Sequence, residues 1–218
     1  LRGTESNHTL VLIDGVRMNP GTIGGAAVQN ISPEMIERIE IVKGARSALF
    51  GTDAIGGVIN IVTRRTDQRF VEGGVGSGSF ATQSGHVSGG NRTSDAEFGV
   101  NIDWQDTDGY APRVDSELER GYENLSANVY ASRKAGNHEL SVRHWRGEGN
   151  VEYLDFFLDP VDQDFENAVT SLALESRPSA AGSSKLVLSF TEDDIQQQQT
   201  PDFVHSERLS LDWQYSHA

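Results

Sequence analysis

Apolar and polar residues alternate along five stretches of the chain. These stretches cover residues 98–104, 125–131, 140–142, 186–190 and 209–215. A period of two predicts β-strands that have one apolar face and one polar face. Together with residues 70–77 and 82–88, the pattern predicts about eight antiparallel strands over the carboxy-terminal part of the chain.

The connections between these strands alternate in length. Residues 91–95 and 135–137 read as short turns, whereas residues 105–121, 148–165 and about 191–203 read as long polar loops. Short turns at one rim and long loops at the other are typical of an outer-membrane β-barrel. The strands of a soluble β-sandwich also alternate apolar and polar residues. Here, however, Asp, Arg and Asn lie within the strands on one face, while the other face is almost purely apolar. This contrast favours strands that face lipid outside and water inside.

The amino-terminal part has a different pattern, with short elements separated by glycine and proline. An apolar strand ends at the turn Asp14-Gly15, and Ser32-Pro33 has the residues that begin a helix. Further elements are a strand over 38–43, a short helix over 46–50 and an apolar strand over 58–62. The sequence therefore predicts a small α+β unit before the barrel strands.

Charge divides the chain at the same place. The formal net charge is −14, yet residues 1–66 hold seven Lys/Arg and six Asp/Glu, while residues 67–218 hold 11 and 26. We therefore predict one domain over 1–66 and a second over 67–218. The acidic balance argues against a nucleic-acid partner, because contact with phosphates needs clustered Lys and Arg.

Three segments in order resemble one family. They are Leu1–Gly3, Val11–Asn19 and Val42–Thr63, and they resemble the plug domain of TonB-dependent outer-membrane receptors, closest to the cobalamin-receptor type. The resemblance implies a plug inside a transmembrane barrel of about 22 strands, of which this chain would supply the first eight or so. It also implies a bacterial outer-membrane location, contact with membrane lipid, and uptake of a scarce ligand driven by TonB with ExbB and ExbD. The sequence has no TonB box, no first plug segment and no carboxy-terminal strand that ends in an aromatic residue. We therefore expect an internal fragment.

The resemblance also implies sites in the plug. The loop over 17–30 resembles the plug loop that touches ligand, and its glycines let a ligand approach the backbone closely. The side chains predicted to contact ligand are Arg17, Met18, Asn19, Thr22 and Ile23. Arg2 and Arg46 resemble plug arginines that pair with glutamates of the barrel wall as a release latch.

Two of the predicted loops are rich in carboxylates. Calcium prefers several oxygen ligands from flexible loops, and the resemblance implies calcium in the equivalent loops of the cobalamin receptor. The candidate ligands are Asp115, Glu117, Asp155, Asp162 and Asp164. Neither loop has the spacing of a dedicated calcium motif, so a solvated anionic surface is the alternative; no cofactor is expected to be required.

Enzyme activity is not expected. The six histidines are scattered, cysteine is absent, and no serine lies in a G-x-S-x-G motif, which leaves a hydrolase on a β-scaffold without a nucleophile and base. Two further alternatives stay open: a ferric-siderophore receptor of the same family, and a soluble calcium-dependent β-rich binding module.

Overall fold

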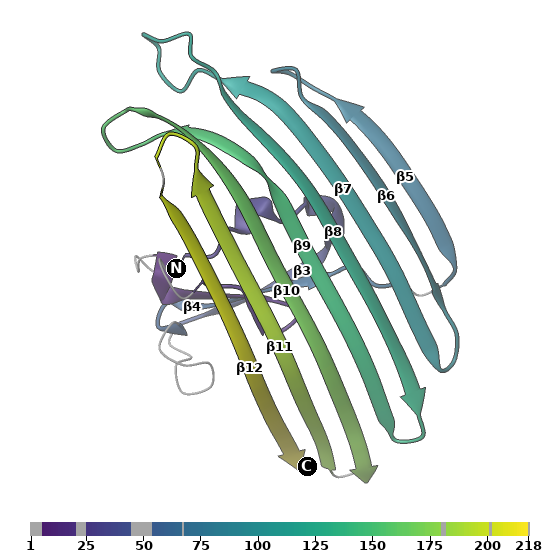
Figure 1. Ribbon diagram of the computed structural model, residues 1–218. Coiled ribbons are helices and arrows are strands. Elements are labelled where there is room, and N and C mark those ends of the chain that lie inside the picture. The colour runs from purple at the N-terminus through teal and green to yellow at the C-terminus, as the bar shows by residue number, and fades with distance from the viewer. Residues whose placement is uncertain are drawn as a thin grey trace.

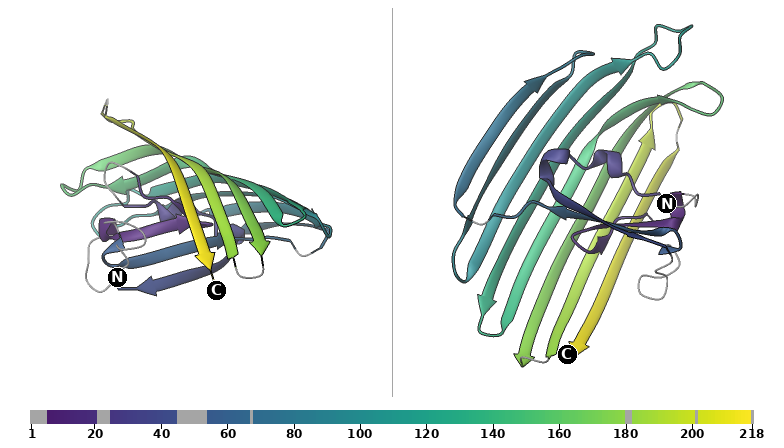
Figure 2. Two further views of the ribbon diagram at one scale, coloured as in Figure 1. Left: turned by 90° about the horizontal axis from the view of Figure 1, so that it is seen from below. Right: turned by 180° about the vertical axis from the view of Figure 1, so that it is seen from behind.

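The computed structural model describes residues 6–20, 25–44, 54–66, 68–179, 182–200 and 202–217. The strands form two separate sheets, one of four strands and one of eight. The eight-stranded sheet is a curved, tilted wall (Figure 1), and the four-stranded sheet lies on its concave side (Figure 2). We call them the outer sheet and the inner sheet.

The inner sheet contains the amino-terminal strands. They are β1 (Thr9–Ile13), β2 (Val16–Arg17), β3 (Ile36–Lys43) and β4 (Gly57–Thr63), in the order β2-β1-β4-β3. β1 and β4 run parallel, whereas the β1–β2 and β3–β4 pairs are antiparallel. All five residues of β1 are buried, which explains why this strand is continuously apolar instead of alternating.

The helices that the structure describes in this unit are short 3-10 turns: η1 (Ser6–His8), η2 (Val28–Asn30) and η3 (Pro33–Met35). The predicted helix start is confirmed, because Ser32 Oγ accepts a hydrogen bond from Glu34 N at 3.3 Å. The helix is only one turn long, since the chain joins the sheet as β3 at Ile36. The helix predicted over residues 46–50 lies outside the described residues. In the described part of the chain, no helix is long and apolar enough to cross a membrane.

Within the inner sheet, β1 is buried on both faces, whereas the edge strand β3 is exposed over most of its length. One face of β1 packs with β2, η3 and two side chains of the outer sheet, Trp145 and Val169. The other face, through Leu10 and Leu12, packs with Ala54 and Val58. The first of these clusters is the apolar contact between the two sheets, and it contributes about 25 cal/mol for each Å² of apolar surface removed from water.

The outer sheet runs in simple sequence order, each strand antiparallel to the next. Its strands are β5 (Phe70–Ser77), β6 (Gln83–Arg92), β7 (Ala96–Tyr110), β8 (Arg120–Ala135), β9 (His138–Leu154), β10 (Pro160–Ser179), β11 (Gly182–Gln197) and β12 (Phe203–His217). The predicted eight strands are confirmed. The sheet is open, with β5 and β12 at its edges, so these strands form part of a barrel wall and not a closed barrel.

Burial in the outer sheet is the inverse of that in a water-soluble protein. On β7, Phe98 and Ile102 point away from the inner sheet and are 55% and 42% exposed, whereas Glu97, Asn101 and Asp103 on the other face are buried. The same inversion recurs on later strands, where exposed leucines alternate with buried serines and asparagines. A sheet with lipid on its outer face and polar groups on its inner face has this pattern.

The predicted loop boundaries were wrong. Strands β7 to β12 have 15 to 20 residues each, so the connections shrink to residues 111–119, 155–159 and 198–202. The hydrogen-bonded ladder continues beyond the region where apolar residues alternate. A membrane-spanning strand needs only about 9–11 residues, and the polar remainder resembled a loop because it no longer has an apolar face.

Candidate functional site: the interface between the sheets

The inner face of the outer sheet supplies the polar surface on which the inner sheet rests. On β8, alternate positions place Asn124, Ser126, Asn128 and Tyr130 on this face, and all four are buried. Buried polar groups need hydrogen-bond partners, and several of these partners come from the inner sheet and its loops. The interface therefore combines one apolar cluster with many polar contacts.

Asp14 and Arg143 form an ion pair across the interface. Asp14 lies at the turn between β1 and β2, and its Oδ2 is 2.7 Å from Arg143 of β9. The same carboxylate accepts hydrogen bonds from the backbone nitrogen of Thr63 at 3.1 Å and from Thr63 Oγ1 at 2.6 Å. The side chains of Arg143 and Asp14 are only 19% and 8% exposed. A charge pair this far from water is sensitive to the loss of either partner.

Tyr130 extends this group of contacts toward the end of the inner sheet. Its hydroxyl accepts a hydrogen bond from Thr66 N at 2.7 Å, and the Arg143 guanidinium lies 5.9 Å from its ring centroid. The ring lies over Gly99, where an added Cβ would come within 2.5 Å of it. Gly99 therefore provides the space that Tyr130 occupies.

A second ion pair joins the segment after β4 to β7. Arg65 binds Glu97 through two hydrogen bonds, at 3.0 and 2.7 Å. Burial alone would lower the pKa of Arg65, but the hydrogen bond and the charge of Glu97 raise it above its ordinary value. Glu97 is 4% exposed, so Arg65 is the residue that compensates its buried negative charge.

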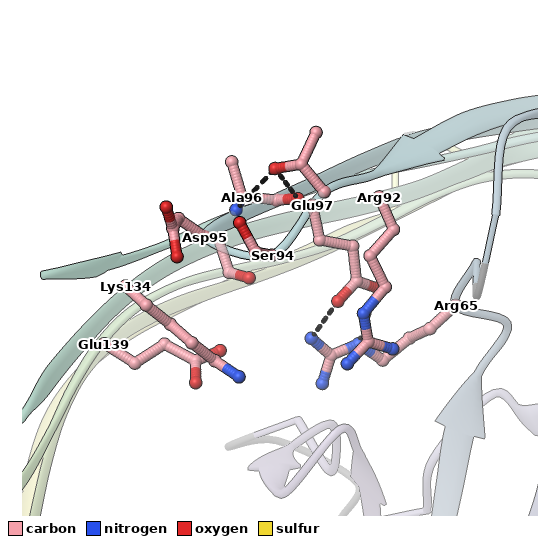
Figure 3. A pocket seen from close by; sticks show the side chains of 10 residues that line it. Arg65, Arg92, Ser94, Asp95, Ala96, Glu97, Lys134 and Glu139 are labelled. Carbon is pink, nitrogen blue, oxygen red and sulfur yellow. Dashed lines mark hydrogen bonds and ion pairs between the residues drawn. The ribbon is translucent and has the colours of Figure 1, made fainter.

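This pair borders a small cavity of about 120 Å³ near the short turns. Figure 3 shows Arg65, Arg92 and Lys134 around it together with Asp95, Glu97 and Glu139. Acidic and basic side chains are mixed in the lining, and the cavity is small. A pocket for an organic ligand is larger and mostly apolar. We therefore interpret this cavity as part of the polar contact between the segment after β4 and the outer sheet, and not as a ligand site.

The segment at η2 contacts the outer sheet through neutral groups. The Asn30 carbonyl accepts from Asn124 Nδ2 at 3.0 Å and from Ser126 Oγ at 3.4 Å, and Asn30 Nδ2 donates to Asn167 at 2.7 Å. Tyr122 donates to the carbonyl of Gln29 at 3.1 Å. No charged side chain takes part in these four contacts.

The residues predicted to contact ligand lie in different environments. Asn19 is 1% exposed; its Oδ1 accepts from Val11 N at 2.7 Å and its Nδ2 donates to the Thr9 carbonyl at 3.1 Å. Met18 belongs to the apolar cluster between the sheets, and Arg17 is half-buried at the end of β2. Thr22 and Ile23 lie outside the described residues. Met18 and Asn19 thus support the inner sheet itself, and ligand contact for the loop stays a prediction.

The predicted latch residues, Arg2 and Arg46, also lie outside the described residues. The ion pairs that the structure describes between the amino-terminal unit and the outer sheet include Asp14–Arg143, Arg65–Glu97 and the exposed pair Arg64–Glu72. In the first, the acid is on the inner sheet and the base on the outer sheet, the reverse of the predicted arrangement. A charge at an inward position of an alternating strand, as at Arg143 and Glu97, was the signal in the sequence that could have identified these residues.

The five candidate calcium ligands do not converge on one place. Asp115 pairs with Arg113 inside its own loop, and the hydrogen bond from Arg113 lowers the pKa of the Asp115 carboxyl. Asp155 accepts from the backbone nitrogens of its own turn, and Glu117 lies in the loop of Asp115. Asp162 and Asp164 do lie together.

Asn150 joins those two carboxylates. Its Nδ2 donates to Asp162 at 2.5 Å and to Asp164 at 2.8 Å. Within the described ranges, the group whose spacing suits a shared metal ion is a different one, Glu192, Asp194 and His205. His205 contacts Asp194 directly, which is an ordinary ion pair when the histidine is protonated. Calcium binding by the predicted residues stays a prediction.

Comparison with known proteins gives one matching family model and several relatives. Residues 1–58 match the TonB-dependent receptor plug domain. The vitamin B12 transporter BtuB of Photobacterium profundum is 33% identical over 183 residues, which is 81% of this chain and 30% of the relative. BtuB of Vibrio vulnificus is 59% identical over 63 residues, 29% of this chain and 10% of the relative.

Solved structures share the fold at low sequence identity. The FrpB iron transporter from Neisseria meningitidis superposes with a TM-score of 0.75 at 13% identity, covering 99% of this chain and 39% of that one. The siderophore receptor PirA from Acinetobacter baumannii gives 0.74 at 17% identity, covering 98% and 38%. At these identities the likeness establishes the fold alone. The chain spans about a third of the length of the relatives that it matches most fully.

Proposed function

Because the chain belongs to the family of TonB-dependent receptors, we propose that it is the plug domain and adjoining barrel wall of a receptor that takes up cobalamin. Receptors of this family are β-barrel proteins of the bacterial outer membrane, which is the location of this chain, and the family is not one of enzymes. The division that we propose is a plug over residues 1–66 and the first barrel strands over 67–218. The uptake activity is that of the full-length receptor.

One observation carries the choice of cobalamin. The relative that aligns with 81% of this chain at 33% identity is a vitamin B12 transporter, and so is the relative at 59% identity over a shorter span. The solved siderophore receptors agree in fold but share 20% identity or less. Sequence likeness of the first kind carries more weight for the ligand than likeness of fold does.

The polar interface between the sheets supports a plug that rearranges during uptake. Hydrogen bonds such as those of Asn30 with Asn124 and Ser126 can be exchanged for bonds to water at a net cost of only about 0.5–1.5 kcal/mol each. An apolar core of the same area would cost more to open. We propose that cobalamin binds to the loops of the outer sheet over residues 111–119, 155–159 and 198–202, which would face the cell exterior, and to the loop over residues 17–30. TonB, with ExbB and ExbD, then drives the plug to move.

Calcium in the exterior loops is a secondary part of the proposal. Asp162 and Asp164 lie together at the loop end of β10, bridged by Asn150, and carboxylate and amide oxygens are ligands that calcium accepts. Ordering of these loops by calcium would fix the surface that a ligand meets first.

A ferric siderophore is the second candidate ligand. The observation in its favour is the shared fold, since FrpB and PirA align with nearly the whole chain. The soluble binding module is not a candidate, because the outer sheet exposes a continuous apolar face of a kind that water-soluble proteins avoid.

Ligand titration of the full-length receptor in detergent tests the proposal. Cyanocobalamin and a panel of ferric siderophores would be titrated separately, with calcium and with a chelator. We expect saturable cobalamin binding, weakened by the chelator. Binding of an iron chelate alone would keep the receptor family and reject cobalamin as its ligand.

A further inference from the structure

Besides the apolar cluster that contains Trp145 and Val169, polar contacts of two kinds attach the inner sheet to the outer sheet. Near the junction of the sheets, the contacts include the two ion pairs Asp14–Arg143 and Arg65–Glu97. At η2, the contacts of Gln29 and Asn30 are neutral hydrogen bonds. Charge-assisted hydrogen bonds are roughly twice as strong as neutral ones, so the two regions should not separate with equal ease.

The backbone of the β1–β2 turn fixes the Asp14 carboxylate in place. Asp14 and Gly15 both have positive φ angles, of 50° and 85°, a conformation that Asp and Gly tolerate better than other residues. Gly15 N also donates to Asn60 Oδ1 at 3.0 Å, which ties the turn to β4. The carboxylate therefore faces Thr63 and Arg143 without needing to reorganise.

The contacts around Arg143 lie where the two sheets are covalently joined. Thr63 is the last residue of β4, Thr66 follows three residues later, and β5 begins at Phe70. Asp14 contacts Thr63, and Tyr130 contacts Thr66. The chain can move least relative to the wall at this point, because it is held by its own backbone as well as by side chains.

We propose that Asp14 and Arg143 are a fixed anchor that positions the plug during uptake, and not a latch that must open. The inference rests on the proposed function, since it concerns the movement of the plug. The anchored part comprises the β1–β2 turn and the end of β4, and it stays on the wall through the transport cycle. The η2 segment, with its neutral contacts, is the part that separates from the wall.

A reversible cross-link distinguishes an anchor from a latch. In the full-length receptor, Asp14→Cys and Arg143→Cys would be combined; this chain has no cysteine of its own. The two thiols would be joined by a short bifunctional methanethiosulfonate reagent and released by dithiothreitol. The matched control is the pair Asn30→Cys with Asn124→Cys, which joins the η2 segment to the same wall.

The anchor predicts opposite results for the two pairs. Without the reagent, the Asp14/Arg143 variant should lose about tenfold in cobalamin uptake, because the charge-assisted contact that holds the β1–β2 turn on β9 is missing. The reagent should restore uptake to within about twofold of the wild-type rate, and dithiothreitol should reverse the gain. Cross-linking the Asn30/Asn124 pair should stop uptake while cobalamin binding in detergent continues.

Three results would overturn the anchor. They are unchanged uptake in the unlinked Asp14/Arg143 variant, uptake that stays blocked when this variant is cross-linked, and full uptake in the cross-linked Asn30/Asn124 variant. If the double variant fails to reach the membrane, Asp14→Asn provides the same test of the charge, because it keeps an acceptor for Thr63. A wild-type receptor that takes up neither cobalamin nor an iron chelate would instead reject the proposed function, and the anchor with it.

Discussion

Replacing Asn19 with alanine separates a structural role from a ligand role. The side-chain amide of Asn19 makes hydrogen bonds with two peptide groups of β1: it accepts from Val11 N and donates to the Thr9 carbonyl. Alanine would leave both groups buried without a partner, at a cost of about 1–3 kcal/mol for each. Local opening of β1 should therefore become easier by about 2–6 kcal/mol.

Amide hydrogen exchange of the full-length receptor in detergent measures this opening directly. Peptides that cover residues 9–13 should exchange at least about 30-fold faster in the variant, since 1.4 kcal/mol corresponds to a factor of ten. Gln29→Ala is the matched control: it removes an exposed side-chain amide from the same loop, and the hydrogen bond from Tyr122 is made to the backbone carbonyl of Gln29, which the substitution keeps. Its exchange over β1 should match that of the wild type.

The result that would refute this reasoning is unchanged exchange over β1 together with lost cobalamin affinity. Asn19 would then contact ligand, and its hydrogen bonds to β1 would not stabilise the strand. Accelerated exchange with nearly normal affinity for cobalamin would confirm the structural role.

Four further outcomes are expected. Tyr130→Phe leaves Thr66 N without its acceptor and should destabilise the plug by about 1–3 kcal/mol in urea unfolding; an unchanged midpoint would contradict this. Gly99→Ala should displace the Tyr130 ring and destabilise the plug, whereas Gly85→Ala, with no contact closer than 3.8 Å, should be nearly neutral. Leu211→Arg places a charge on the lipid face and should cost about 2–4 kcal/mol in refolding into bilayers; a smaller effect than at an inward position would argue against lipid contact. Asp162→Asn combined with Asp164→Asn should abolish any effect of calcium on cobalamin binding, and calcium dependence that persists would reject this site.

The sequence predicted the class of the fold well because one physical rule governs each sheet. Alternation over residues 98–104 is required by a strand with lipid on one side, and the continuous apolar run of β1 is required by burial on both sides. Both patterns depend on the environment of single residues, so they can be read from the sequence alone.

The ends of the strands and the contacts between the sheets could not be predicted in this way. Polar residues such as those at 148–154 form strand because a neighbouring strand pairs with them, and this pairing leaves no local pattern. Asp14 was expected as a turn residue, but its partner Arg143 is 129 residues away and on another sheet. Asn19 resembled an exposed loop residue because its burial depends on β2 folding back beside β1.

Uptake by cells tests the central claim most directly. The full-length receptor would be expressed in a bacterium that lacks its own cobalamin receptor, and uptake of labelled cyanocobalamin would be followed with TonB present and absent. We predict saturable uptake that requires both the receptor and TonB. Uptake of a ferric siderophore but not of cobalamin, or cobalamin uptake that does not depend on TonB, would contradict the account.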